Sequence, residues 1–193
     1  MTRIVAGSLG GRRITAPPGR DTRPTSDRVR EALFSTLEAM TNLHGARFAD
    51  LYAGSGAVGL EAASRGAARV LLVEADAKAA RVARTNVSVL GLGEVVEVAA
   101  RRVDAVLATG PDRAYDVVFA DPPYPTSDTE VVQMLAALAD RGWLAPDAVV
   151  VVERSVRSPE PDWPAGLSDQ RGRRYGETML WYGRASASRR TEQ

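Results

Sequence analysis

The residues best suited to chemistry form the tetrapeptide Asp121-Pro122-Pro123-Tyr124, which follows the apolar run YDVVFA. Two consecutive prolines make a rigid, non-helical turn, and the carbonyl of Pro122 can then point into a site. If this carbonyl and Asp121 each accept an N–H of a base amine, the nitrogen lone pair becomes available for attack on a methyl donor. Tyr124 would stack on the base, which contributes about 1–3 kcal/mol. The tetrapeptide predicts methyl transfer to an exocyclic amine, accelerated mainly by proximity and orientation; the alternative is a strand-end turn with Tyr124 packed in the core.

A second candidate site is the stretch DLYAGSGAVG, in which Gly54, Gly56 and Gly59 spell G-x-G-x-x-G. Glycines let the backbone pass close to a ligand, and the helix that follows offers unpaired N–H groups. Glu74 comes 20 residues after Gly54, where an acidic side chain binds ribose hydroxyls. Both NAD and S-adenosylmethionine carry such a ribose, so these residues alone do not distinguish the two cofactors.

Asp50 favours S-adenosylmethionine over a dinucleotide. A carboxylate at this turn would repel a pyrophosphate, whereas it can hold the ammonium group of S-adenosylmethionine directly or through water. The alternative is that Asp50 only bonds backbone amides of the loop. We expect Val103 to cover the adenine and Asp104 or a backbone group to meet its amine. The predicted cofactor residues are Asp50, Tyr52, Gly54, Ser55, Gly56, Gly59, Glu74, Ala75, Val103 and Asp104.

Alternating apolar strands and helices supply the elements that would position these residues. Short apolar runs separated by helical patterns predict an α/β fold, a doubly wound, mostly parallel sheet with helices on both faces. Ligands bind beyond the carboxyl ends of such strands. The expected strands span 47–52, 69–74, 95–99, 116–121 and 149–153, and the expected helices span 58–65, 77–90, 103–109 and 128–141.

Both ends of the chain depart from this alternation. Residues 3–15 predict a hairpin, and a helix follows from an N-cap at Thr25 or Ser26 to about Met40. The stretch GRRYGETMLWYGR predicts an antiparallel hairpin around Gly176 at the sheet edge, which completes a Rossmann-like sheet of seven strands. We therefore divide the chain into an N-terminal basic extension (1–40), a catalytic domain (41–185) and a frayed tail (186–193).

The composition excludes several kinds of site. The 193 residues contain no cysteine, which excludes disulfides, thiolate metal sites and the cysteine nucleophile of 5-methylcytosine enzymes. The single histidine, His44, makes no metal site, so no metal is expected. The N-terminus lacks an apolar signal segment, and no apolar run approaches the roughly 20 residues that span a bilayer. A cytoplasmic protein with no membrane partner is expected.

Positive charge is concentrated at the N-terminus. The net charge is only +1, but residues 1–30 hold seven arginines against two aspartates. In a flap beside the active site these arginines would bind RNA phosphates, giving a salt-sensitive affinity. The alternative is that they are solvated surface charges. The candidates for RNA binding are Arg3, Arg12, Arg13, Arg20 and Arg23.

Five segments carry a family resemblance: RIVAGSLGGRRI, RPTSDRVREALFSTL, DLYAGSGAVGLEAASRGA, LLVEAD and DPPY. With them the chain resembles the RsmD family of guanine-N2 methyltransferases of 16S ribosomal RNA. These are class I S-adenosylmethionine-dependent enzymes with a (D/N/S)PP(Y/F/W) motif. The resemblance implies a monomeric bacterial enzyme that methylates one guanine of 16S rRNA in the small ribosomal subunit.

The same resemblance assigns roles to particular residues. Asp50, Gly54, Gly56 and Glu74 would bind the cofactor, and residues 121–124 would hold the target base. Thr25 and Arg28 would approach the methionyl end of the cofactor, although Thr25 could equally be a helix cap. Arg102 departs from the small polar or acidic residue of relatives and shifts the adenine contact to the Val103 backbone or Asp104.

Three other functions remain open. An adenine-N6 methyltransferase acting on DNA or RNA would use the same tetrapeptide, although no DNA-recognition domain is visible. An NAD-dependent oxidoreductase would bind NADH, but nothing after residue 100 resembles a hydride-transfer site. A non-catalytic RNA-binding protein would keep its biological effect after Asp121→Ala.

Overall fold

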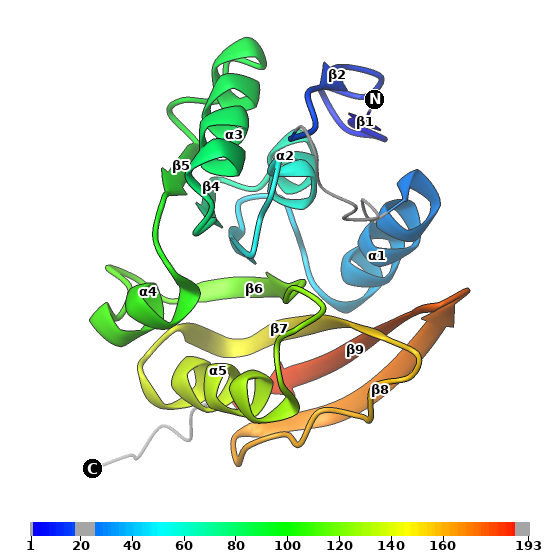
Figure 1. The fold of residues 1–193 in the computed structure, drawn as a ribbon, viewed down its shortest axis with the longest axis vertical. Coiled ribbons are helices and arrows are strands. Elements are labelled where there is room, and N and C mark those ends of the chain that lie inside the picture. Colours follow the sequence, from blue (N-terminus) through cyan, green and yellow to red (C-terminus); the bar gives the residue numbers. More distant parts are fainter. Residues whose placement is uncertain (1, 18–25, 188–193) are drawn as a thin grey trace.

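A seven-stranded sheet with the strand order β5-β4-β3-β6-β7-β9-β8 forms the centre of the protein (Figure 1). The computed structural model describes residues 2–17 and 26–187. The first five strands in this order are parallel, and the β8–β9 hairpin is added antiparallel to β7. This arrangement confirms the predicted α/β fold. The strands are β3 (Arg47–Leu51), β4 (Arg69–Val73), β5 (Val96–Ala99), β6 (Tyr115–Ala120), β7 (Leu144–Ser155), β8 (Leu167–Tyr175) and β9 (Thr178–Ala185).

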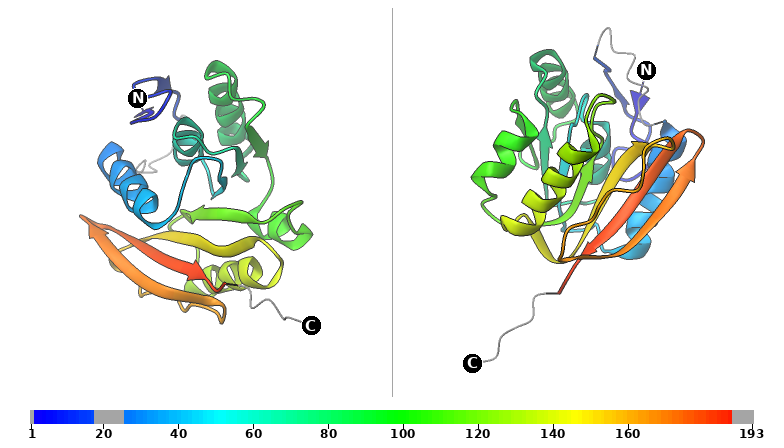
Figure 2. Two further views of the ribbon diagram at one scale, coloured as in Figure 1. Left: turned by 180° about the vertical axis from the view of Figure 1, so that it is seen from behind. Right: turned by 60° about the horizontal axis from the view of Figure 1, so that its bottom comes forward.

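Helices cover both faces of the sheet. In the right-hand view of Figure 2, α4 and α5 lie in front of the sheet and α1 lies behind it. Strand residues alternate between the two cores, so that Phe48 packs on the side of α1 and Ala49 on the side of α5. We call these the first and second cores. The helices are α1 (Asp27–Met40), α2 (Ala57–Ser64), α3 (Ala77–Val89), α4 (Val103–Thr109) and α5 (Asp128–Asp140).

Side chains at the predicted boundaries begin three of the helices. Ser26 caps α1 by accepting from Val29 N, and Asp76 caps α3 in the same way from Ala79 N. Ser127 and Glu130 form a reciprocal capping box at α5. Such caps satisfy N–H groups that the first helical turn leaves unpaired. None of the described helices is long and apolar enough to cross a membrane.

The largest error in the predicted boundaries is at β7. We expected this strand to begin at Val149, but it begins at Leu144, which pairs with Tyr115. Pro146 interrupts the apolar pattern, and the following Asp147 has φ +62°. The register shifts between Tyr115 and Val117, and this irregularity lets the strand continue through the proline.

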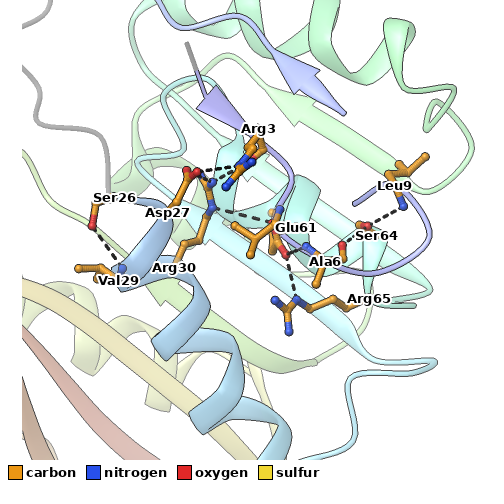
Figure 3. Close-up of polar contacts among 12 residues, drawn as sticks. Arg3, Ala6, Leu9, Ser26, Asp27, Val29, Arg30, Glu61, Ser64 and Arg65 are labelled. Carbon is orange, nitrogen blue, oxygen red and sulfur yellow. Dashed lines mark hydrogen bonds and ion pairs between the residues drawn. The ribbon is translucent and has the colours of Figure 1, made fainter. Parts of the chain in front are cut away.

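The N-terminal segment forms the expected hairpin, with β1 (Thr2–Arg3) antiparallel to β2 (Arg13–Ile14). In Figure 1 it lies beside α2. Buried Glu61 of α2 accepts hydrogen bonds from Val5 N at 2.7 Å and Ala6 N at 2.9 Å, as Figure 3 shows for Ala6. A Cβ on Gly7, whose φ is +83°, would lie 2.1 Å from Ser64 O. The segment is therefore fitted closely to the surface of α2.

A buried arginine connects this segment to α1 (Figure 3). Arg30 is fully buried; its Nη2 donates to Arg3 O at 2.6 Å and to Asp27 at 2.8 Å. Its Nε lies 3.9 Å from Glu61, and burial lowers the pKa of Arg30. The first core includes Ile4, Ile14, Leu33, Phe34 and Leu37 together with residues of the sheet. The predicted domain boundary at residue 40 thus does not coincide with a break in the hydrophobic core.

Candidate active site

Four carboxylates gather at the carboxyl edge of the sheet, on adjacent strands β4, β3, β6 and β7. Each comes two positions after a residue of the first core, so the alternation of strand side chains directs all four to the same face. Neighbouring strands are roughly 4.8 Å apart, which brings the acidic groups within reach of one another. They are Glu74, Asp50, Asp121 and Glu153, which follow Leu72, Phe48, Phe119 and Val151 respectively.

Asp50 is almost completely buried, with 2% of its surface exposed. Its carboxylate accepts a hydrogen bond of 2.9 Å from Gly59 N. Burial raises its pKa to about 7, aided by the charges of Glu74 and Glu153 and opposed by the Gly59 hydrogen bond. The backbone contact considered as the alternative role is therefore present. A contact between Asp50 and a cofactor ammonium stays a prediction.

Glu74 joins the end of β4 to the glycine loop. Its carboxylate is buried and accepts from Gly54 N at 2.8 Å and from Asp76 N at 2.8 Å. These bonds hold the first glycine of the motif against the strand end. The neighbouring Ala75 is exposed. A ribose contact by Glu74 and Ala75 stays a prediction.

Backbone geometry explains two of the glycines. Gly54 has φ +57°, and no atom lies within 4 Å of the place where its Cβ would be, so this turn borders open space. A Cβ on Gly59 would lie 2.2 Å from Leu72 Cδ2, so Gly59 lets α2 approach the sheet closely. Tyr52 also has a positive φ, +64°, which is uncommon for a bulky residue and marks local strain.

A side chain of α3 also holds the glycine loop in place. The carbonyl of Ser55 accepts from Asn86 Nδ2 at 3.0 Å, and the same amide group donates to Thr15 O at 2.9 Å. Gly56 has φ +85° and is the N-cap of α2. The buried Asn86 thereby fixes both the glycine loop and the end of the N-terminal hairpin.

The expected adenine-contact residues begin α4. Val103 is buried in the second core, whereas Asp104 is exposed. The Asp104 carboxylate accepts from Arg102 Nε and Nη2, both at 3.0 Å. These bonds lower the pKa of Asp104. Arg102, the departure from the family pattern, is thus the partner of Asp104, and an adenine contact here stays a prediction.

The tetrapeptide begins where β6 ends. Asp121 N donates to Leu51 O at 3.3 Å, which places the turn beside the glycine loop. The pKa of Asp121 is raised well above its usual value by burial and by the charges of Glu153 and Asp50. Pro122 is buried, Pro123 is exposed, and Tyr124 is 88% exposed. The alternative of a core aromatic at Tyr124 is wrong, and this ring is available for stacking.

The first turn of α1 lies at the same edge of the sheet. The helix ends at Met40 and the chain enters β3 at Arg47, so α1 runs antiparallel to β3 and begins near its carboxyl end. Arg28 in this first turn is exposed. Thr25, predicted to approach the cofactor, lies outside the described residues.

The arginines predicted to bind RNA have different surroundings. Arg3 is exposed and pairs with Asp27 at 3.0 Å. Arg12 donates to Val89 O at 3.2 Å, and Arg13 is exposed on β2. Arg20 and Arg23 lie outside the described residues. RNA binding by this group stays a prediction.

Sequence reasoning missed Glu61, Arg30 and Asn86, which hold the N-terminal segment in place. Glu61 could have been noticed as the one charged residue of the otherwise small and apolar AVGLEAAS. Asn86 and Arg30 carry no such signal, since both occur in polar helical sequence. Glu153 ends the expected strand 149–153, and its position in the sequence alone assigns it no role.

Surface hollows and metal sites do not define this site. One hollow of about 480 Å³ is lined by residues 38–44 and Arg65, and another of about 160 Å³ lies between α5 and residues 159–162. Neither includes the strand-end carboxylates. Within residues 2–17 and 26–187, no group of three acidic or histidine side chains is arranged to hold a metal ion. The site is therefore recognised from the placement of its side chains.

This chain is similar to known proteins both in sequence and in fold. The family described as "Conserved hypothetical protein 95" matches residues 2–184. Ribosomal RNA small subunit methyltransferase D of Escherichia coli K12 is 35% identical over 175 residues, which cover 91% of this chain and 85% of the relative. The solved structure of yhhF from Escherichia coli has a TM-score of 0.85 and 33% identity, covering 96% of this chain and 98% of the other.

A more distant likeness supports the fold alone. Magnesium protoporphyrin IX methyltransferase from Synechocystis PCC 6803, solved with bound SAM, has a TM-score of 0.62 at 18% identity and covers 82% of this chain and 79% of its own. The family model and the near relatives, in contrast, cover 91% or more of this chain, a span that includes both the glycine loop and the tetrapeptide of this sequence. The chain belongs to the Conserved hypothetical protein 95 family, that is, the RsmD family of methyltransferases.

Proposed function

We propose that this protein transfers a methyl group from S-adenosylmethionine to the exocyclic N2 amine of one guanine in 16S ribosomal RNA. The observation that carries the proposal is the convergence of the glycine loop and Asp121 at one edge of the sheet, on the same face. The name of the relative from Escherichia coli supports ribosomal RNA of the small subunit as the substrate. We further propose that the enzyme acts as a monomer, in the cytoplasm, on the small ribosomal subunit.

The residues at this edge fit S-adenosylmethionine. Gly54 borders open space, and the buried acidic residues Glu74 and Asp50 lie beside it. Among the described residues no group of acidic or histidine side chains is arranged to hold a metal ion. A sulfonium and an ammonium group are attracted by such carboxylates, whereas a pyrophosphate would be repelled. These acidic side chains therefore suit a cofactor that carries positive charge and no phosphate. When bound, S-adenosylmethionine supplies an electrophilic methyl group on a sulfonium sulfur.

Asp121 and the carbonyl of Pro122 orient the target amine. Each accepts one N–H bond, which turns the nitrogen lone pair toward the methyl carbon. When bound, S-adenosylmethionine would supply its methyl group to this nitrogen, and the electrons of the broken carbon–sulfur bond would stay on sulfur. Methylation leaves an acidic N–H, and Asp121, whose pKa is raised, accepts that proton. Tyr124, exposed beside the turn, stacks on the base.

The target guanine must leave its base stack in the RNA before it can enter the active site. Extrusion of a base costs a few kcal/mol, and less where the nucleotide is unpaired. Arg3, Arg12 and Arg13 of the N-terminal hairpin are exposed and can contact phosphates of the RNA. Such contacts position the RNA without reading its sequence.

Methylation with labelled S-adenosylmethionine tests the proposal. The substrates are small subunits, and RNA purified from them, from cells that lack the enzyme, and nucleosides are analysed afterwards. We expect label in N2-methylguanosine at a single nucleotide. Label only in N6-methyladenosine would overturn the proposed substrate, and no label in either substrate would overturn the proposed activity.

A further inference from the structure

Glu153 is an acidic residue of the site for which the proposed reaction has no role. It follows four buried valines, 149–152, in β7. Val152 pairs with Ala120 of β6, so Glu153 and Asp121 are the next residues on two neighbouring parallel strands. On its other side Glu153 pairs with Leu180 of β9. The sheet thus holds Glu153 beside the residue proposed to bind the target amine.

The two carboxylates face the same space. Val151 and Phe119 both pack in the first core, and strand side chains alternate, so Glu153 and Asp121 project toward that same side. The charge of Glu153 contributes to raising the pKa of Asp121 and of Asp50. Its carboxylate is therefore close enough to act electrostatically on both, and it is only half-buried.

A guanine has an edge that matches two adjacent carboxylates. Its N2 amine carries two N–H donors, and the neighbouring N1 carries a third. In the proposed reaction Asp121 and the Pro122 carbonyl accept the two N2 protons, so the N1–H still needs an acceptor. Adenine presents a lone pair at N1 beside its amine, and a carboxylate placed there would be repelled. A donor left unpaired or an acceptor placed against an acceptor is strongly disfavoured in a desolvated site.

We propose that Glu153 accepts the N1–H of the target guanine and so determines the choice of guanine over bases whose reactive amine adjoins a ring-nitrogen lone pair. The inference rests on the proposed function and concerns the specificity of the same site. Glu153 thereby has a function distinct from that of the neighbouring Asp121. Asp121 orients the amine that reacts, and Glu153 reads the adjacent ring nitrogen.

The test first uses a base that lacks the hydrogen on N1 and then changes Glu153, the side chain proposed to accept that hydrogen bond. Once the methylated nucleotide has been mapped, small-subunit RNA is prepared with guanine or 2-aminopurine at that position, and assembled into subunits where these are the substrate. 2-Aminopurine keeps the exocyclic amine but has a lone pair at N1. For the unmodified enzyme we expect methylation of guanine to exceed that of 2-aminopurine by on the order of 10- to 100-fold in kcat/KM.

Glu153→Gln should change this ratio. The amide of glutamine can donate a hydrogen bond to the N1 lone pair of 2-aminopurine, so the preference for guanine should fall to near one or invert. Glu94→Gln, an exposed glutamate before β5, is the matched control and should keep the original ratio. Binding of S-adenosylhomocysteine and the Tm of each variant verify that the fold and the cofactor site persist.

Two results would overturn the role of Glu153. One is a Glu153→Gln enzyme with the same guanine preference as the unmodified enzyme. The other, which does not require the variant to fold, is an unmodified enzyme that methylates 2-aminopurine as well as guanine. Both are distinct from failure of the proposed function, in which the unmodified enzyme would form no N2-methylguanosine at all.

Discussion

Glu61→Gln tests how the N-terminal segment is attached to the rest of the protein. The Glu61 carboxylate is fully buried and accepts from Val5 N, Ala6 N and Arg65 Nε at 2.7, 2.9 and 3.0 Å. Its charge also lies near the buried Arg30. An amide of the same shape has a single acceptor oxygen and turns an NH₂ group toward one of these donors.

The expected loss follows from the bonds that disappear. Each hydrogen bond to a charged group contributes about 1.5–3 kcal/mol, and a buried donor left unpaired adds to the loss. We therefore expect the free energy of unfolding to fall by about 3 kcal/mol. For a protein of this length that lowers Tm by roughly 6–12 °C.

Glu38→Gln is the matched control. Glu38 also pairs with Arg65 at 3.0 Å, but its side chain is 49% exposed, and such pairs contribute about 0–1 kcal/mol. Urea unfolding and thermal unfolding of both variants give the comparison. Equal and small losses in the two variants would refute the view that burial of Glu61 anchors the segment.

Four further outcomes are expected. Asp121→Ala should lower kcat on small subunits by about 10²–10³-fold, as for loss of one preorganised contact to a reacting group, while calorimetry still detects cofactor binding; activity near that of the unmodified enzyme would contradict its role. Because the pKa of Asp50 is raised to about 7 in the folded state, folding favours the protonated form of this carboxyl. The carboxyl therefore stabilises the fold at low pH, and this stability is lost as the pH rises from about 4 to about 7. Asp50→Asn should therefore flatten the pH dependence of the unfolding free energy in this interval, and an unchanged slope in urea titrations would contradict the assignment. Gly59→Ala should lower the free energy of unfolding by about 1–3 kcal/mol because its Cβ would collide with Leu72; a Tm equal to that of the unmodified protein would show that α2 can move away. Arg13→Gln should weaken RNA binding and reduce the slope of log K against log salt by about one, whereas an unchanged slope in filter binding would show that this side chain meets no phosphate.

Local patterns were sufficient to predict the sheet. Strands such as β7, with four consecutive buried valines, require cover on both faces, and the intervening helices follow from their periodicity. The position of Asp121 at a strand end came from the same pattern, because two prolines stop both strand pairing and helix formation. These features depend on residues close together in sequence.

Contacts between distant residues were not predictable in this way. Periodicity indicates that Glu61 lies on a buried helix but not that its partner is the backbone of Val5, 56 positions earlier. The N-terminal hairpin was correctly expected, yet its attachment to α2 depends on that contact and on Gly7. Asp50 illustrates another limit, since one carboxylate suits both a backbone amide and a cofactor, and only the position of Gly59 N reveals the first contact.

The four strand-end carboxylates are unfavourable for the protein alone. Burial and mutual repulsion raise the pKa of Asp50 and Asp121, which indicates that the folded chain would hold protons, or bind positive charge, at this edge. Groups perturbed in this way are typical of functional sites. In the proposed reaction the positive charge of the sulfonium offsets the carboxylates before transfer.

In the same proposed reaction, the charge would pass to the methylated amine and then, with the proton, to Asp121. The net charge at the sheet edge therefore stays constant during the step, and no charge has to be separated in a poorly solvated site. What the carboxylates can change is the stability of that positive charge at each position. Acidic groups on adjacent strands can offset it both beside the methyl donor and at the target amine, which one carboxylate alone could do less well.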